Sequence, residues 1–178
     1  MSRIFRCQNC FESYIFWNGI GFSFPQKYNE LFTDALSGKY GERLKELLQE
    51  NPNAIIDAAT SVYVCEYCRH WIESPVLDCY LPAHKMRKQK KKQIWAVSMP
   101  IDINNLEHPV VPPWELRKGY KLLERYKHIC PKCSSEMKMC QLDPFGLDSV
   151  YEELSDAMLR CPICGGDIVD TGEIVMID

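Results

Sequence analysis

The chain has 178 residues, of which 46% are hydrophobic and 25% charged, and its formal net charge is −3. This composition is typical of a soluble globular protein with one large or two small domains. No apolar run approaches the length of a membrane span, and the first seven residues lack the apolar stretch of a signal peptide. We therefore expect a cytoplasmic protein without a membrane partner, in a compartment that keeps thiols reduced.

The charge is unevenly distributed along the chain. Residues 141–178 contain nine acids and one arginine, a balance of −8, so residues 1–140 sum to +5. A protein coated uniformly by nucleic acid is not expected from this pattern, whereas a local basic contact is compatible with it.

The first third of the chain predicts two strands, then two helices, then a third strand. A Cys-x-x-Cys turn at residues 7–10 opens an aromatic stretch that runs to Phe24, and Gly19 and Gly21 divide it into a strand, a turn and a strand. Apolar residues then recur at helical spacing from Pro25 to Gly38, and again in a shorter helix that ends at residues 51–52. Residues 62–64 predict a strand that enters the next Cys-x-x-Cys turn, at residues 65–68.

The middle of the chain predicts a hairpin with a basic tip. Residues 76–81 are β-like, and residues 95–103 alternate between apolar and polar, with Pro100 indicating an edge strand. Between them lies a run of six basic residues, which could contact phosphates without reading sequence: Lys85, Arg87, Lys88, Lys90, Lys91 and Lys92.

A proline-rich connector follows, and residues 114–127 then predict a helix with Gly119 as a weak point. We place a domain boundary near residues 105–113. It divides the chain into an N-terminal unit of residues 1–108 and a C-terminal unit of residues 109–178. In the second unit, a short helix is expected near residues 149–155 and a hairpin over residues 168–177.

Eight of the ten cysteines form four Cys-x-x-Cys pairs, at positions Cys7 and Cys10, Cys65 and Cys68, Cys130 and Cys133, and Cys161 and Cys164. Each pair can place two thiolates on one ion, and two pairs complete a tetrahedral four-sulfur site, so we expect two Zn²⁺ ions, with iron as the alternative. Sequence order favours pairing within each half, the first pair with the second and the third with the fourth. A crossed arrangement is the alternative.

The remaining cysteines and histidines are expected to play lesser roles. Cys79 and Cys140 are interpreted as small buried hydrophobic residues. His70 and His128 lie two residues from a predicted ligand and are expected at the surface or beside the metal site, with a ligand role as the alternative.

Residues 130–178 resemble a zinc ribbon of the Cys-Pro-x-Cys-Gly type, through Cys130-Pro131-Lys132-Cys133 and Cys161-Pro162-Ile163-Cys164-Gly165. Residues 7–79 resemble a zinc-ribbon or rubredoxin-like unit with a helical insertion. The resemblance implies metal binding. We therefore predict a small metal-stapled α+β protein with two zinc-ribbon-like units, a helical insertion and β-hairpins.

An all-cysteine site is closed, and the sequence contains none of the common nucleotide-binding, metalloprotease, deaminase or hydrolase motifs. We therefore expect a protein that is not an enzyme. The leading hypothesis is an adaptor with an unidentified protein partner. The alternatives are a nucleic-acid-binding protein that uses the basic run, and a rubredoxin-like iron electron carrier.

Overall fold

The structure is a computed structural model that describes residues 2–17, 25–83, 111, 116, 119–140 and 159–175. The chain forms two compact units, each assembled from separated segments. The first, here called the cysteine unit, comprises residues 1–19, 60–74 and 127–178, and the second, the helical unit, comprises residues 20–59 and 75–126. This division differs from the expected domains 1–108 and 109–178. Most of the proposed boundary at residues 105–113 lies outside the described residues.

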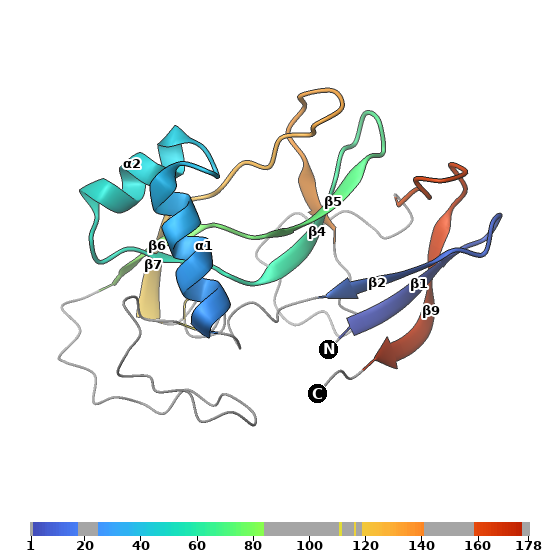
Figure 1. Cartoon of the computed structure of the whole chain (residues 1–178), viewed down its shortest axis with the longest axis horizontal. Coiled ribbons are helices and arrows are strands. Elements are labelled where there is room, and N and C mark those ends of the chain that lie inside the picture. Colours follow the sequence, from blue (N-terminus) through green and yellow to red (C-terminus); the bar gives the residue numbers. More distant parts are fainter. Residues whose placement is uncertain are drawn as a thin grey trace. The chain divides into compact units, whose positions relative to one another are not determined.

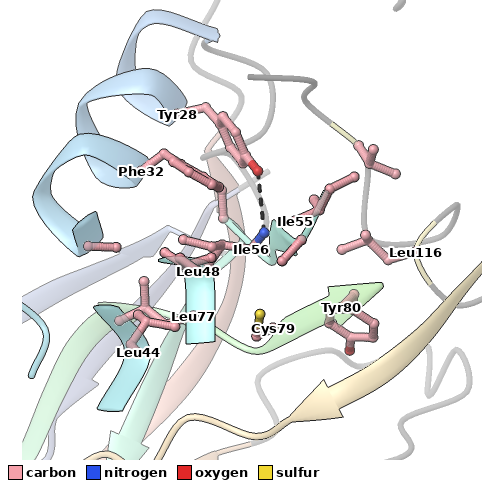
Figure 2. Packing of buried hydrophobic residues seen from close by; sticks show 14 residues of the cluster. Tyr28, Phe32, Leu44, Leu48, Ile55, Ile56, Leu77, Cys79, Tyr80 and Leu116 are labelled. Atoms are coloured by element: carbon pink, nitrogen blue, oxygen red, sulfur yellow. Dashed lines mark hydrogen bonds between the residues drawn. The ribbon is translucent and has the colours of Figure 1, made fainter. Parts of the chain in front are cut away.

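The helical unit contains both described helices, α1 (Pro25–Ser37) and α2 (Glu42–Glu50), as the apolar spacing predicts. Gly38 follows α1 with a φ of 91°, a left-handed conformation that glycine adopts without steric penalty. The two helices bury one face each in a common core that also contains residues of the neighbouring strands (Figure 2). At the centre of this core the buried Tyr28 hydroxyl accepts a hydrogen bond from the Ile56 N–H at 3.3 Å.

Three short strands complete the helical unit: β3 (Ile55–Ile56), β6 (Cys79–Pro82) and β7 (Tyr120–Glu124), in the antiparallel order β3-β6-β7. The predicted helix over residues 114–127 is therefore wrong over β7, although Leu116 and Gly119, which precede β7, are helical. Its apolar periodicity is real, but the segment extends to pair with β6, where Leu81 lies opposite Lys121. The strand expected at residues 95–103 lies outside the described residues.

One sheet of the cysteine unit, here called the outer sheet, joins segments from the two ends of the chain. It contains β2 (Ser13–Trp17), β1 (Ser2–Cys7) and β9 (Ile168–Val175), in the antiparallel order β2-β1-β9 (Figure 1). The predicted hairpin of residues 168–177 is instead one bulged strand over its described part, residues 168–175. The predicted turn is present, because Gly172 has a φ of 76°, but it is absorbed as a register shift opposite residues 3–5 of β1.

The second sheet of this unit, here called the inner sheet, has the antiparallel order β5-β4-β8 (Figure 1). Its strands are β4 (Thr60–Val64), β5 (Trp71–Pro75) and β8 (Lys138–Cys140). The strand predicted at residues 62–64 is confirmed by β4. Apolar side chains from both sheets share one core, which includes Phe5 and Phe16 of the outer sheet and Val62 and Val64 of the inner sheet.

The part of the chain that is described therefore contains two helices and three small antiparallel sheets, which fits the predicted small α+β class. No helix in this part has the length and apolar character needed to cross a membrane. Besides the strand expected at residues 95–103, three further predictions fall outside the described residues: the strand after Gly21, the basic hairpin tip and the helix at residues 149–155.

Candidate metal centres

The four Cys-x-x-Cys turns, here called knuckles 1 to 4 in chain order, share one backbone conformation. In each, the N–H of the first cysteine donates to the carbonyl five residues later, and the N–H four residues later donates back to the first cysteine's carbonyl. These eight hydrogen bonds measure 2.8–3.1 Å from donor to acceptor. The first cysteine of every knuckle is buried and the second is exposed. Each knuckle is therefore a preformed turn that presents two sulfurs.

The residue directly after the second cysteine is left-handed in all four knuckles. Gly165 occupies this position in knuckle 4 with a φ of 73°, and Phe11, Arg69 and Ser134 occupy it in the others with φ between 60° and 62°. Glycine is the residue expected here, yet three side-chain-bearing residues adopt the same conformation. The hydrogen bonds that close each knuckle therefore outweigh the preference of these three residues for negative φ.

The knuckles associate crosswise. Knuckles 1 and 4 form one cluster, here called the outer site, from Cys7, Cys10, Cys161 and Cys164. Knuckles 2 and 3 form the other, the inner site, from Cys65, Cys68, Cys130 and Cys133. The predicted pairing within each half is therefore wrong, and the crossed alternative holds. The reason is that β1 pairs with β9 and β4 pairs with β8, which brings the partner knuckles together.

The sulfur positions fit a four-coordinate ion. In the outer site Cys7 Sγ lies 3.4 Å from Cys164 Sγ, and Cys10 Sγ lies 3.6 Å from Cys161 Sγ. The corresponding distances in the inner site are 3.4–3.6 Å. A tetrahedron with metal–sulfur bonds of about 2.3 Å has edges of about 3.8 Å. All ten cysteines are free thiols, so both clusters are four-cysteine sites that could hold metal ions, consistent with zinc-ribbon-like metal sites.

The electrostatics of the outer site favour a cation. Removal from water raises the pKa of Cys161, but hydrogen bonds from the Tyr14 hydroxyl and from backbone N–H groups outweigh this and lower it to about 6. The pKa of Cys10 shifts in the opposite direction. A backbone hydrogen bond at Glu12 lowers its pKa, but removal from water and the neighbouring sulfurs raise it to about 12. Without a cation, the cluster resists carrying four negative charges.

The inner site likewise has one cysteine whose pKa is lowered and one whose pKa is raised. Hydrogen bonds from the Ser135 side chain and backbone lower the pKa of Cys133 to about 6. A backbone hydrogen bond at His70 lowers the pKa of Cys68, but removal from water and the surrounding sulfurs raise it to about 12. A bound divalent cation would stabilise all four thiolates in either site.

The two sites are structural repeats of one another. In each sheet, the central strand leads into the first of the site's two knuckles. The strand on one side of it follows that same knuckle, and the strand on the other side follows the site's other knuckle. The repeat extends to individual backbone hydrogen bonds. Ile168 N–H donates to the Leu159 carbonyl at 3.3 Å in the outer site, and Met137 N–H donates to the His128 carbonyl at 2.8 Å at the matching inner positions. Isolated bridges also match, Arg160 with Asp167 and Ile129 with Glu136. The repeating unit is therefore one four-cysteine cluster together with its three-stranded sheet.

The other predicted residues fall as follows. Cys79 and Cys140 are buried in the apolar cores of the helical and cysteine units, as expected for small hydrophobic residues. His70 and His128 belong to neither sulfur cluster. His128 is buried and stacks on Tyr63 with ring centroids 3.6 Å apart. The six basic candidates at residues 85–92 lie outside the described residues.

Sequence reasoning missed Tyr14 as part of a site and assigned it only to the aromatic stretch. Its hydroxyl lies 3.0 Å from Cys161 Sγ. Phe16 of the same stretch is buried in the core of the cysteine unit. Tyr14 follows Cys10 by four positions on a strand, but no sequence signal places it against knuckle 4, because that contact depends on the crossed pairing.

Comparison with protein-family models, with curated protein sequences and with solved structures finds no match for this chain. The two sulfur clusters are therefore the observations from which a function can be argued.

Proposed function

We propose that this is a non-enzymatic zinc protein in which two structural Zn²⁺ ions hold a scaffold for protein–protein interaction. The observation that carries this proposal is the pair of closed four-cysteine clusters, with sulfurs 3.4–3.6 Å apart. Four thiolates fill a tetrahedral coordination shell and leave no position for substrate, which favours a structural role over catalysis. The zinc-ribbon resemblance of the knuckles supports the same conclusion.

The location of the sites supports a stapling role. The outer site joins residues that are 151 positions apart in the sequence, and the inner site joins residues 62 positions apart. The sheets beside them are only three strands each, so a small apolar core is reinforced by metal, as is common in small domains.

The interaction role is supported by apolar side chains exposed on the knuckles. Tyr67 of knuckle 2 is 82% exposed, Phe11 beside knuckle 1 is 72% exposed and Ile163 of knuckle 4 is 69% exposed. Rigid turns that hold large apolar side chains in water provide contact area with little loss of conformational entropy on binding. These three residues are the proposed contact points for a protein partner.

The metal assignment is tested by elemental analysis of the natively expressed protein. We expect two zinc ions per chain, and one in each of the variants Cys10→Ser and Cys68→Ser. Cys79→Ala is the matched control, because it removes a buried thiol that is not a predicted ligand, and it should retain two. A red protein that contains iron and has a reversible one-electron couple would instead support the electron carrier.

The interaction role is tested separately with a triple variant, Phe11→Ser, Tyr67→Ser and Ile163→Ser. We expect it to keep both zinc ions and to lose a partner that the wild-type protein captures specifically from native extract. A wild-type protein that captures no partner, or a variant that captures the same partner equally well, would contradict the adaptor proposal.

A further inference from the structure

The internal repeat allows the surroundings of the two sites to be compared position by position. Tyr14 stands four residues after the second cysteine of knuckle 1, and Ile72 stands four residues after that of knuckle 2. Tyr14 brings a hydroxyl to Cys161, whereas Ile72 packs as an apolar side chain against the cluster that contains Cys65 and Cys130. At this position the outer site has a hydrogen-bond donor and the inner site has none.

A second pair of matching positions shows the opposite difference. Ser135 stands two residues after the second cysteine of knuckle 3, and its carbonyl accepts the Cys130 N–H at 2.8 Å, which closes the knuckle. From this position its side chain hydrogen-bonds to Cys133 of the inner site. The matching residue of knuckle 4 is Gly166, which has no side chain to donate. At these two compared positions, each site therefore has one hydroxyl donor, and the two donors come from different positions of the repeat.

Tyr14 is held firmly in its position. Its ring lies edge-to-face with that of Trp71, with centroids 5.6 Å apart. The Trp71 indole N–H in turn donates to the carbonyl of Arg160, the residue before Cys161, at 2.9 Å. The hydroxyl and its sulfur acceptor are thus fixed to the same framework.

A metal-bound thiolate carries no proton, so in a loaded site the hydroxyl must be the donor. Such a bond withdraws charge from sulfur and helps four thiolates to share one divalent ion. We propose that Tyr14 and Ser135 are positioning residues that each donate a hydroxyl hydrogen bond to one ligand thiolate, so that each raises the metal affinity of one site alone. This proposal rests on the proposed role of the two clusters as metal sites.

The two effects should differ in size. Cys161 is 2% exposed and Tyr14 is half-buried, whereas Cys133 is exposed. A hydrogen bond to a charged group is stronger where water is excluded. Tyr14 is therefore expected to contribute more to the outer site than Ser135 contributes to the inner site.

The test uses the full chain loaded with cadmium-113, because each four-sulfur site then gives its own NMR resonance. The resonances are assigned with Cys10→Ser and Cys68→Ser, and the cadmium affinity of each site is measured by competition with EDTA. In Tyr14→Phe, which keeps the ring against Trp71, we expect the outer resonance to shift and the outer affinity to fall about tenfold or more. The inner site should be unchanged.

Ser135→Ala is the reciprocal variant and should shift only the inner resonance, with a smaller loss of affinity. Equal losses at both sites in Tyr14→Phe would indicate general destabilisation and would overturn the proposal, as would unchanged resonances and affinities. A wild-type chain that binds no cadmium would instead refute the metal sites themselves. The two failures are therefore distinguishable.

Discussion

The residue that closes each knuckle is under steric strain in three of the four. Phe11 has a φ of 62°, so its backbone is in the left-handed region, where a Cβ atom is crowded. Its side chain is 72% exposed and therefore gains little from packing. Because L-residues lose roughly 1–2 kcal/mol there and glycine does not, Phe11→Gly should stabilise the metal-loaded protein. The gain should be about 1 kcal/mol at most, since glycine also has more freedom in the unfolded chain.

The matched control is Phe11→Ala, which removes the same ring but keeps the Cβ. Thermal unfolding at equal free zinc should place the midpoint of Phe11→Gly several degrees above that of Phe11→Ala. A glycine variant that melts no higher than the alanine variant would mean that the φ at this position is not a source of strain.

At the scale of single residues, the eight cysteines grouped in the two clusters were all predicted, because Cys-x-x-Cys spacing alone places two sulfurs on one turn. Tyr14 and Ser135 were not. A hydroxyl residue near a knuckle is common in any sequence, and only the three-dimensional pairing shows which sulfur it reaches. The left-handed conformation of Phe11, Arg69 and Ser134 was not predicted either, because it is one that glycine adopts far more readily than residues with a side chain.

Among the elements, β5 connects the two sites. It follows knuckle 2 of the inner site, yet its first residue, Trp71, packs against Tyr14 and Phe16 of β2 and donates to the Arg160 carbonyl. Trp71→Phe removes the indole N–H and leaves that carbonyl without this donor. We expect a loss of about 1 kcal/mol in stability and a weaker outer site.

Cadmium-113 resonances again provide the measurement, with Ile72→Val as the control on the neighbouring residue of β5. Trp71→Phe should shift the outer resonance, and Ile72→Val, which packs near Cys65 and Cys130, should affect the inner one. An outer resonance that is insensitive to Trp71 would show that β5 does not couple the sites.

A helix or strand could be predicted from the sequence where nearby residues decide its conformation, and not where a distant partner strand decides it. Both α1 and α2 were predicted, because a repeating apolar face and a terminating Gly38 or Asn51 act within a few residues. The strand β7 was predicted as a helix, since its state is decided by pairing with β6, which is distant in sequence. For β9 the turn at Gly172 was recognised, but whether it forms a hairpin or a bulge depends on the partner strand β1.

For the whole molecule, the two units should respond differently to metal removal. The helical unit has its own apolar core of helices and strands and contains none of the clustered cysteines, whereas metal and folding should be coupled in the cysteine unit. Chelation should therefore unfold one unit and leave the other. Cys140 in the core of the cysteine unit and Cys79 in the core of the helical unit serve as reporters.

The measurement is alkylation by iodoacetamide at pH 8, followed by peptide mass spectrometry. Burial raises the pKa of the Cys79 thiol to about 11, so it should stay protonated and unmodified with or without metal. Cys140 should be modified only after chelation. Simultaneous modification of both thiols on metal removal would show that the units unfold together.

The crossed pairing is the feature of the whole molecule that sequence order could not provide. Lengthening a closing loop from the 55 positions between Cys10 and Cys65 to the 151 between Cys10 and Cys161 adds only about 1 kcal/mol of closure entropy. A few strand-pairing contacts outweigh this difference. Proximity along the chain is therefore a weak guide to which knuckles form a cluster.

The crossed pairing also has a consequence for the order of events during protein synthesis. At roughly 5 to 20 residues per second, a ribosome needs about 8 to 30 s to advance from Cys10 to Cys161. During that interval knuckle 1 has no native partner, and for most of it knuckle 2 has already been made and offers two competent thiolates. Metal captured early would join the wrong knuckles. Correct loading therefore requires either that metal arrives after synthesis or that thiolates exchange on the ion once knuckle 4 has emerged.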